Sequence, residues 1–544
     1  MRVMAGALGD CVHVAGVSRF LTLAEQQGHE TLFTGPATDI ESFVDAIHDF
    51  NPNIVGVSYR LTPENARLLI EEFWGIIRAA GLDNRRFVFG GTPPVADVAR
   101  ELGGFEAVFD GSEAPNALIG FLRGETGQTG QAPIPPQTTI ARIQWKAPYP
   151  ILRHHFGIPA FSIAPTVDGI AQIAEAGALD VISLGADQDA QEHFFRPDLQ
   201  NPKSKGAGGV PFRSEDDLSR LREAAQRGNY PLLRSYSGTA DLLRYAEMLK
   251  RTLNNAWCAT SLFFFNAMDG RGPQALEDSI RDHIALMAWH GARDIPVEGN
   301  EPYHWGMRDA PDLISVVASY LYAYNAKKAG VHDYIATYMF ESPNTLSNRM
   351  DLAKALAQIQ VAEAFAGADF RIWRQTRTGL LSYPVDAARA RAHLAESIYL
   401  QMTLRPSIIH IVGYTEAHHA ATAAEVIESS AMAQQVIETA LYGQPDMTTD
   451  PVVQARVAEL VEESADLIEA IRGLGADSVT DPLSDPHTLA RAVQVGLLDA
   501  PQLKRNPFAR GEICTRAING AILAVDIDNR PLTERQRLQQ LHLA

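Results

Sequence analysis

The stretch MRVMAGALGDCVHVAG, residues 1–16, joins a short apolar run to a helix-like segment through a loop of small and polar residues. The run 2–5 is typical of a β-strand, and the periodicity of 17–28 predicts a helix. Four more such pairs follow, with predicted strands at 30–33, 53–58, 86–90 and 107–110, and predicted helices at 40–49, 62–80, 95–102 and 114–123. Strands that alternate with helices in this way predict an α/β domain, a doubly wound parallel sheet, over residues 1–123.

A second α/β series follows residues 124–150, which we predict to be a linker because 124–139 is rich in Gly, Pro, Gln and Thr. Its apolar or β-rich runs lie at 160–164, 180–185, 231–236, 259–265, 294–299, 334–340, 369–374 and 407–413. Each run precedes a segment with helical periodicity, and eight βα units in about 280 residues predict a (β/α)8 TIM barrel over 151–445. An open eight-stranded sheet is the alternative. Residues 446–544 predict a C-terminal helical extension that begins with a charged helix at 452–471.

Composition and charge exclude several classes of protein. The chain has 47 Lys and Arg against 65 Asp and Glu, and its net charge of −18 argues against a broad surface for nucleic acid or an anionic membrane. No run of ~18 apolar residues predicts a membrane-spanning helix. Three cysteines (Cys11, Cys258 and Cys514) are too few for a disulfide framework, and residues 1–16 lack the pattern of a signal peptide. We therefore expect a cytoplasmic protein that binds neither nucleic acid nor membrane.

The loop after the first predicted strand carries an imidazole, His13, and a carboxylate three residues before it, Asp10. Ligands of doubly wound sheets bind outside the carboxyl ends of the strands, so this loop is placed to meet one. A histidine beside an aspartate suits a metal ligand that is oriented through its other ring nitrogen. Neither G-x-G-x-x-G nor G-x-x-x-x-G-K-[ST] is present for phosphate binding. The alternative is a helix-start loop with a capping aspartate.

These loops resemble the corrinoid-binding domain of cobalamin-dependent mutases and methyltransferases. That family has D-x-H-x-x-G after its first strand, S-x-L after its third and G-G after its fourth. In this chain the Asp-to-His and Ser-to-Leu spacings are each one residue longer. The resemblance implies a cobalamin site formed by Asp10, His13, Gly16, Ser58, Leu61, Gly90, Gly91 and Gly111. It also implies that His13 is the lower ligand of the cobalt, and that the glycines let the nucleotide tail approach the sheet.

Polar residues at the ends of the predicted barrel strands indicate the second half of the site, because TIM barrels place their chemistry there. The candidate catalytic residues are Arg234, Asp269, Arg271 and Glu298. Several arginines at one barrel mouth favour a substrate carboxylate, which a guanidinium binds as a bidentate fork. Apart from the cobalt, no metal bound by protein side chains is expected, since the histidine pairs lack a metal-binding spacing.

The barrel and tail also resemble, more distantly, the catalytic subunit of glutamate mutase (methylaspartate mutase). The clearest stretches are Pro231-Leu232-Leu233-Arg234 and the Glu301-Pro302 turn, and Arg234 falls where the family has an arginine that helps to hold the substrate carboxylate. Thr166 stands where the family has another arginine, and the stretch from Asn266 to Gly272 replaces its Glu and Tyr pair.

The two resemblances imply an adenosylcobalamin-dependent radical mutase, an isomerase that acts on a small carboxylated substrate and forms a homodimer. We expect the carboxyl ends of both sets of strands to face the cofactor from opposite sides. The alternatives are a corrinoid-dependent methyltransferase and a non-catalytic corrinoid carrier or regulator.

Overall fold

The computed structural model describes residues 1–113, 115–122 and 134–542. The chain divides into two compact units, Met1–Pro133 and Ile134–Ala544. Each unit has its own parallel sheet and its own hydrophobic core.

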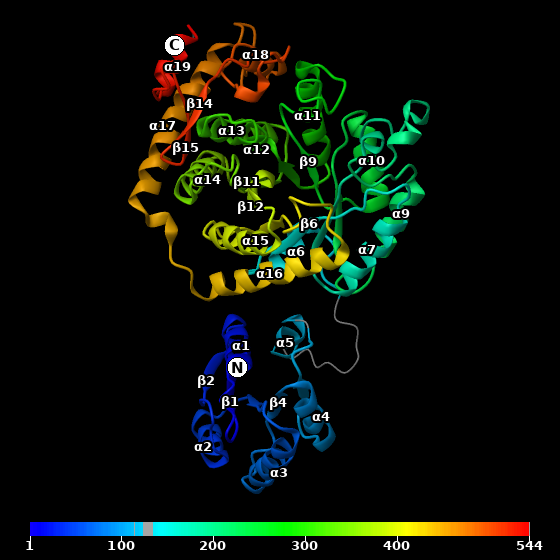
Figure 1. Ribbon diagram of the computed structural model, residues 1–544, viewed down its shortest axis with the longest axis vertical. Helices are drawn as coiled ribbons and strands as arrows, with labels where there is room; N and C mark the ends of the chain where they lie inside the picture. The colour runs from blue at the N-terminus through cyan, green and yellow to red at the C-terminus, as the bar shows by residue number, and fades with distance from the viewer. Residues whose placement is uncertain (114, 123–133, 543–544) are drawn as a thin grey trace. The chain divides into compact units, whose positions relative to one another are not determined.

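The first unit contains a five-stranded sheet with helices on both faces (Figure 1). Its strands are β1 (Arg2–Ala7), β2 (Glu30–Phe33), β3 (Ile54–Ser58), β4 (Arg86–Gly90) and β5 (Ala107–Phe109). Its helices are α1 (Ala15–Gln26), α2 (Ile40–Phe50), α3 (Pro63–Ala79), α4 (Pro93–Leu102) and α5 (Pro115–Leu122). The strands are parallel and lie in the order β2-β1-β3-β4-β5, which is flavodoxin-like. The predicted doubly wound sheet is confirmed.

Alternate residues of the strands pack on the two faces of this sheet. Met4 and Val55 contact α2, α3 and α4 through a cluster that includes Phe73. Val3 and Ile54, the neighbours of these residues in sequence, pack on the opposite face against α1 and α5. A strand that is buried on both faces reads as a continuous apolar run, as residues 54–57 do.

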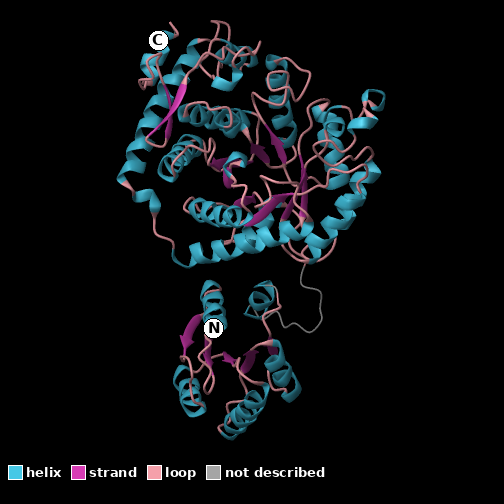
Figure 2. Ribbon diagram, in the orientation of Figure 1, coloured by secondary structure: helices cyan, strands magenta, loops and turns pink. Residues whose placement is uncertain are grey.

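The second unit contains eight parallel strands in the order β8-β7-β6-β13-β12-β11-β10-β9, which form a nearly closed barrel (Figure 2). They are β6 (Ile151–His155), β7 (Val181–Leu184), β8 (Leu232–Ser235), β9 (Cys258–Thr260), β10 (Val297–Gly299), β11 (Asp333–Phe340), β12 (Arg371–Thr378) and β13 (Ile408–Ile411). The helices around them are α7 (Ala164–Glu175), α8 (Gln188–Glu192), α9 (Glu215–Ala224), α10 (Leu242–Leu253), α11 (Leu276–Gly291), α12 (Glu301–Gly306), α13 (Asp312–Lys328), α14 (Asn348–Glu363), α15 (Ala387–Met402) and α16 (Ala423–Gly443). The predicted barrel is confirmed.

The predicted first barrel strand, 160–164, is wrong. The chain bends at 160–163, Phe161 is 77% exposed, and α7 begins at Ala164. Pro165 lies in the first turn of α7, where the fixed φ of proline favours a helix start. The first strand is β6, which the polar residues of ILRHH (151–155) hid from a search for apolar runs.

Helix α6 (Thr139–Lys146) lies in the stretch that the sequence predicted to be a linker. Its Ile143 packs against Ile151, Val181 and Leu232, the first residues of three barrel strands. Buried Arg142 donates from Nη2 to the carbonyl oxygen of Tyr230 at 2.9 Å. Residues 134–150 are therefore part of the second unit, and α6 covers the amino end of its barrel. The rest of the predicted linker, 124–133, lies outside the described residues.

The C-terminal extension is only partly helical. Its helices are α17 (Pro451–Gly473), α18 (Pro486–Gln494) and α19 (Glu534–Gln540), and an antiparallel hairpin joins β14 (Thr515–Ile518) to β15 (Ala521–Ala524). Asn519 and Gly520 form the turn with φ of 51° and 81°, and positive φ at both central residues is typical of a two-residue hairpin. Among the described helices, none is both long and apolar enough to cross a bilayer.

Candidate functional site

The carboxyl edge of the first sheet brings the predicted corrinoid loops together. The order of the strands reverses between β1 and β3, and ligands of such sheets bind at this switch point. The backbone N–H of Leu8 donates to the carbonyl oxygen of Ser58 at 2.9 Å, which ties the loop after β1 to the end of β3. The N–H of Tyr59 donates to the carbonyl oxygen of Gly90 at 3.1 Å and ties β3 to β4.

The loop after β1 presents His13 to solvent. Cys11 is buried in the core, and its carbonyl oxygen accepts from the N–H of Ala37 at 2.9 Å, so the loop is anchored two residues before the exposed imidazole. Val14 is the N-cap of α1 and makes no side-chain capping bond, so a capping role for Asp10 is wrong.

Asp10 lies on the β3 side of this loop. Burial and then the Asp10 carboxylate raise the pKa of Tyr59, although the Tyr59 hydroxyl makes no hydrogen bond. Among the hydrogen bonds of residues 1–113, none joins Asp10 to His13. The longer Asp-to-His spacing therefore leaves the imidazole of His13 without the aspartate partner that the family pattern has.

Three of the four predicted glycines border open space. A Cβ added to Gly16, Gly90 or Gly111 would meet no atom within 4 Å. By contrast, a Cβ on Gly91 would lie 2.8 Å from the carbonyl oxygen of Tyr59, so Gly91 serves the packing of the sheet. Ser58, at the end of β3, is 6% exposed, and Leu61 beyond it is 37% exposed. An exposed imidazole next to strand ends that border open space fits a large corrinoid cofactor.

The interior of the barrel is polar in its middle layer. Since side chains alternate along a strand, every second residue of each barrel strand points inward. The lowest inward layer is apolar and contains Ile151, Val181, Leu232, Trp257, Ile335 and Ile408. The next layer is joined by hydrogen bonds and contains Arg153, Ser183, Arg234, Glu298, Thr337 and Gln375. Barrels usually fill this space with branched apolar side chains, so the polar layer indicates a ligand site.

Glu298 holds two arginines at the centre of this layer. Its Oε2 accepts from Arg153 Nη1 and Arg234 Nη2, each at 2.9 Å, and from Trp257 Nε1 at 2.5 Å. Its Oε1 accepts from Gln375 Nε2 at 3.0 Å. Because both oxygens are occupied and the residue is 2% exposed, Glu298 positions the guanidinium groups and does not itself reach a ligand.

Because Glu298 is paired with Arg153 and Arg234, we expect the free energy of unfolding to depend on pH. Burial opposes ionisation, but Arg153 and Arg234 outweigh it and lower the pKa of Glu298 to about 2. A pKa below that of the unfolded chain adds stability that is present above about pH 5 and is lost as the pH falls toward 2. At pH 7, Glu298→Gln should destabilise by about 3 to 5 kcal/mol, because it leaves two buried guanidinium groups without a counter-charge.

Urea unfolding at a series of pH values tests this expectation. The free-energy difference between wild type and Glu298→Gln should shrink as the pH falls from about 5 to 2. Glu223→Gln, on the exposed face of α9, is the control and should match the wild type throughout. A Glu298→Gln difference that stays constant over this range would contradict the ion pairing.

Above Glu298, several buried polar groups have no partner. Within the described barrel, Arg234 is 0% exposed, and its Nε and Nη1 make no hydrogen bond. The same holds for both side-chain atoms of Asn300, for His304 Nε2 and for His410 Nδ1. Arg377 is 5% exposed and donates from Nε only to the neighbouring carbonyl oxygen of Thr378, at 3.4 Å. Buried donors are costly to leave unpaired, and three arginines against one glutamate leave positive charge, so the cluster suits an anionic ligand.

Asp269 and Arg271 lie on the rim of the barrel. Asp269 accepts from the backbone N–H groups of Phe265 at 3.2 Å and Asn266 at 3.0 Å, and so holds the loop after β9. Arg271 pairs with it at 3.1 Å, and the Arg271 side chain is 40% exposed. Of the four residues predicted to be catalytic, the structure brings Arg234 and Glu298 together in the interior and pairs Asp269 with Arg271 on the loop, where Arg271 Nη2 also lies 3.5 Å from His304 Nδ1.

Sequence reasoning missed Arg153, Trp257 and Gln375, all of which bind Glu298 or its partners. The alternation of side chains along the strands indicates two of these residues. In β12 the two-residue period puts Gln375 on the face of Arg377, and in β6 it puts Arg153 on the face of Ile151. The misplaced first strand concealed the second of these patterns.

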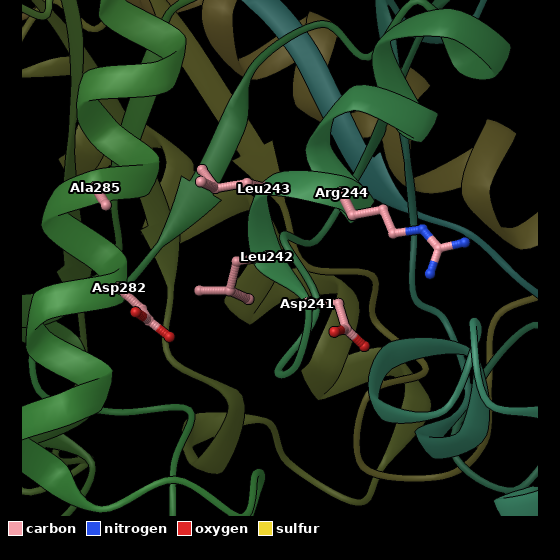
Figure 3. A pocket seen from close by; sticks show the side chains of 6 residues that line it. All are labelled: Asp241, Leu242, Leu243, Arg244, Asp282 and Ala285. Carbon is pink, nitrogen blue, oxygen red and sulfur yellow. The ribbon is translucent and has the colours of Figure 1, made fainter.

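A shallow cavity of about 250 Å³ lies outside the barrel, at α10 and α11. Figure 3 shows its lining of Asp241, Leu242, Leu243, Arg244, Asp282 and Ala285. None of the predicted site residues lies there. Among the described residues, no group of three or more His, Cys, Asp or Glu side chains could hold a metal ion.

Comparisons with known proteins identify the domain type of the first unit. Residues 1–119 match the family model of the B12 binding domain. A cobalamin-binding protein from Desulfitobacterium hafniense is 25% identical over 22% of this chain and 57% of its own, with a TM-score of 0.20. The chain therefore spans little more than half the length of that protein. No curated protein matches the sequence.

Two further solved structures are similar over more of the chain. A rubisco-like protein from Alicyclobacillus acidocaldarius is 15% identical over 60% of this chain and 74% of its own, with a TM-score of 0.35. The cobalamin-dependent S-adenosylmethionine radical enzyme OxsB is 11% identical over 90% of this chain and 70% of its own, with a TM-score of 0.19. From the family match and the fold together, the chain has a B12-binding domain at its N-terminus, and a parallel barrel domain follows it.

Proposed function

We propose that this protein is an adenosylcobalamin-dependent mutase that rearranges a small carboxylated substrate inside its barrel. The observation that carries the proposal is the combination, in one chain, of a B12-binding domain with a barrel whose buried Arg234 keeps two donors unpaired. A radical isomerase needs a cofactor site and a substrate site that excludes water, and it needs no second protein-bound metal.

In this proposal the cofactor is held at the carboxyl edge of the first sheet. His13 would bind the cobalt, and Gly16, Gly90 and Gly111 would leave room for the ring and its nucleotide tail. Asp10, Ser58 and Leu61 line the same edge. When bound, adenosylcobalamin supplies a cobalt–carbon bond whose homolysis starts radical rearrangements.

The residues of the barrel bind and orient the substrate. Arg234 donates from Nε and Nη1 to the carboxylate, while Glu298 fixes its remaining nitrogen at 2.9 Å. Arg153 shares that glutamate, so the pair is aligned before the substrate arrives. Because Arg234 is fully buried, its bonds to the substrate form away from water, where they are strongest.

Turnover tests the proposal directly. The full chain is incubated with adenosylcobalamin and a panel of short amino, hydroxy and oxo carboxylates, and products are identified by nuclear magnetic resonance. At least one carboxylate should yield an isomer of unchanged mass, and only with the adenosyl form of the cofactor. Methyl transfer from methylcobalamin without isomerisation would overturn the proposal in favour of a methyltransferase. Cofactor binding without any turnover would favour a carrier.

Two neighbouring glycines should respond in opposite ways to substitution. At Gly90 a new side chain enters open space, so Gly90→Leu should keep the fold and block the cofactor. At Gly91 even a methyl group meets the Tyr59 carbonyl oxygen at 2.8 Å, so Gly91→Ala should destabilise the first unit by about 1 to 3 kcal/mol.

Thermal unfolding and cobalamin titration of both variants separate these effects. Gly90→Leu should unfold at the wild-type temperature and bind cobalamin at least about tenfold more weakly, a loss of about 1.4 kcal/mol. Wild-type affinity for cobalamin in Gly90→Leu would show that the open space beside Gly90 is not part of the site.

A further inference from the structure

Two inward-facing side chains above the arginine pair touch one another and take no part in the roles assigned so far. The hydroxyl of Tyr236, just beyond β8, lies 3.0 Å from Nε2 of His155 at the end of β6. The two rings are stacked, with centroids 5.4 Å apart and an interplanar angle of 15°. Both residues are partly accessible, whereas Glu298 and Arg234 are buried.

The neighbours of His155 fix which ring nitrogen carries its proton. Nη2 of Arg153 lies 3.4 Å from the same Nε2, and a guanidinium can only donate. Nε2 is therefore the acceptor, the ring proton sits on Nδ1, and the Tyr236 hydroxyl donates to Nε2. The tyrosine oxygen keeps its lone pairs for another partner.

Arg234 places a substrate carboxylate beside this pair. Its guanidinium carbon lies 4.6 Å from the centroid of the Tyr236 ring, and two of its donors are unpaired. A carboxylate on those donors would bring the rest of a small substrate close to the Tyr236 hydroxyl. The unpaired donors and the hydroxyl thus serve one ligand.

We propose that Tyr236 and His155 form a proton relay that acts on the substrate, and that binding of the substrate carboxylate to Arg234 switches the relay on. An O–H or N–H bond of the substrate breaks, and its electron pair stays on the substrate. The substrate proton bonds to the Tyr236 oxygen, while the hydroxyl proton of Tyr236 moves to Nε2 of His155. The ring becomes an imidazolium, nothing is oxidised or reduced, and the reverse transfer returns the proton to the product.

The charges around His155 explain the switch. Burial and then Arg153 hold the pKa of His155 well below its ordinary value, so the ring is neutral at pH 7 in the free protein. The groups that face the ring are Arg153 and His154 from β6, Arg234 and Tyr236 from β8, Arg377 from β12 and His410 from β13. A bound carboxylate offsets the positive charge of the arginines. The pKa of His155 should then rise by at least about one unit, which makes the imidazole a competent base.

This inference rests on the carboxylate substrate of the proposed function, but its test needs no cobalamin. Ring-labelled histidine is incorporated into the full chain, and its resonances are followed between about pH 5.5 and 8.5 with and without formate, malonate or succinate. His155→Gln identifies the resonance of His155. His283 is a buried residue of α11 that faces Asp282 and Asp269 but no arginine, and it is the internal control.

We expect the free protein to show no titration of His155 in this range. With at least one carboxylate, His155 should titrate within the range while His283 stays unchanged. A His155 that already titrates near its ordinary pKa without carboxylate would overturn the inference. So would a His155 that no carboxylate moves, because the arginine cluster would then be closed to such anions.

Tyr236→Phe separates the relay from simple packing, because it removes the hydroxyl and keeps the ring. It should leave carboxylate binding unchanged and lower kcat in the reconstituted enzyme by about 100-fold or more, with little change in KM. Wild-type kcat in Tyr236→Phe would remove the relay from the mechanism and leave the proposed mutase reaction standing.

Discussion

Arg234→Met is expected to lower kcat/KM of the reconstituted enzyme by about 100- to 1000-fold. The variant removes the two unpaired donors that the proposal assigns to the substrate carboxylate. Truncating one member of a buried charge pair costs about 2 to 5 kcal/mol, of which each 1.4 kcal/mol is tenfold. Steady-state kinetics with the substrate found in the turnover screen gives the measurement.

The variant should still fold, because Glu298 keeps a second arginine. Arg153 Nη1 lies 2.9 Å from its Oε2, and Trp257 and Gln375 donate to it as well. Arg234→Lys should recover only part of the activity, because an ammonium is a point charge and cannot present the planar fork.

Arg271→Met provides the matched control. Its side chain is 40% exposed and pairs with Asp269 on the rim, so its loss should change kcat/KM less than about tenfold. Two results would contradict a substrate site in the interior of the barrel and favour one at its rim. The first is a larger loss of kcat/KM in Arg271→Met than in Arg234→Met, and the second is a kcat/KM of Arg234→Met within tenfold of the wild type.

The second large effect is expected at the other end of the chain. His13→Ala should weaken cobalamin binding by about 100-fold or more, since loss of a group that merely supports a metal ligand already costs about 10- to 100-fold. His13 is exposed at the tip of an anchored loop, so the fold should not change. A cobalamin titration monitored by absorption spectroscopy measures the affinity and shows whether the cofactor keeps its own benzimidazole on the cobalt.

His48→Ala, at an exposed position in the last turn of α2, is the control for the loss of an imidazole from this unit. It should bind cobalamin as the wild type does. Equal affinities of His13→Ala and wild type would make the lower-ligand assignment untenable.

The sequence predicted the first unit well because its inner strands are largely apolar and its loops carry small residues at fixed places. Both faces of the sheet are covered, so β3 reads as an unbroken run. Gly90 and Gly91 could be recognised as a pair, but their different surroundings could not, because the contact between Gly91 and Tyr59 depends on the register of β3 and β4.

The barrel shows the limit of the same reasoning. The inner layer of the barrel is polar, so β6 lacks the apolar character by which strands are recognised. The first barrel strand was therefore predicted at residues 160–164 instead. Arg234 and Glu298 were found because they lie at the ends of recognisable strands, whereas their meeting at 2.9 Å depends on closure of the barrel. The pairing of Tyr236 with His155 joins residues 81 positions apart and has no local signal.

In the proposed holoenzyme the His13 imidazole binds the cobalt, and electron paramagnetic resonance can identify the nitrogen that does so. The full chain is prepared with histidine labelled with nitrogen-15 and loaded with the cobalt(II) form of cobalamin. If the ligand is a histidine of the protein, each cobalt line should change from a triplet with natural-abundance protein to a doublet with the labelled protein, and the doublet should be absent in His13→Ala. A triplet that persists in the labelled protein would show that the cofactor keeps its own base and that His13 does not bind the cobalt.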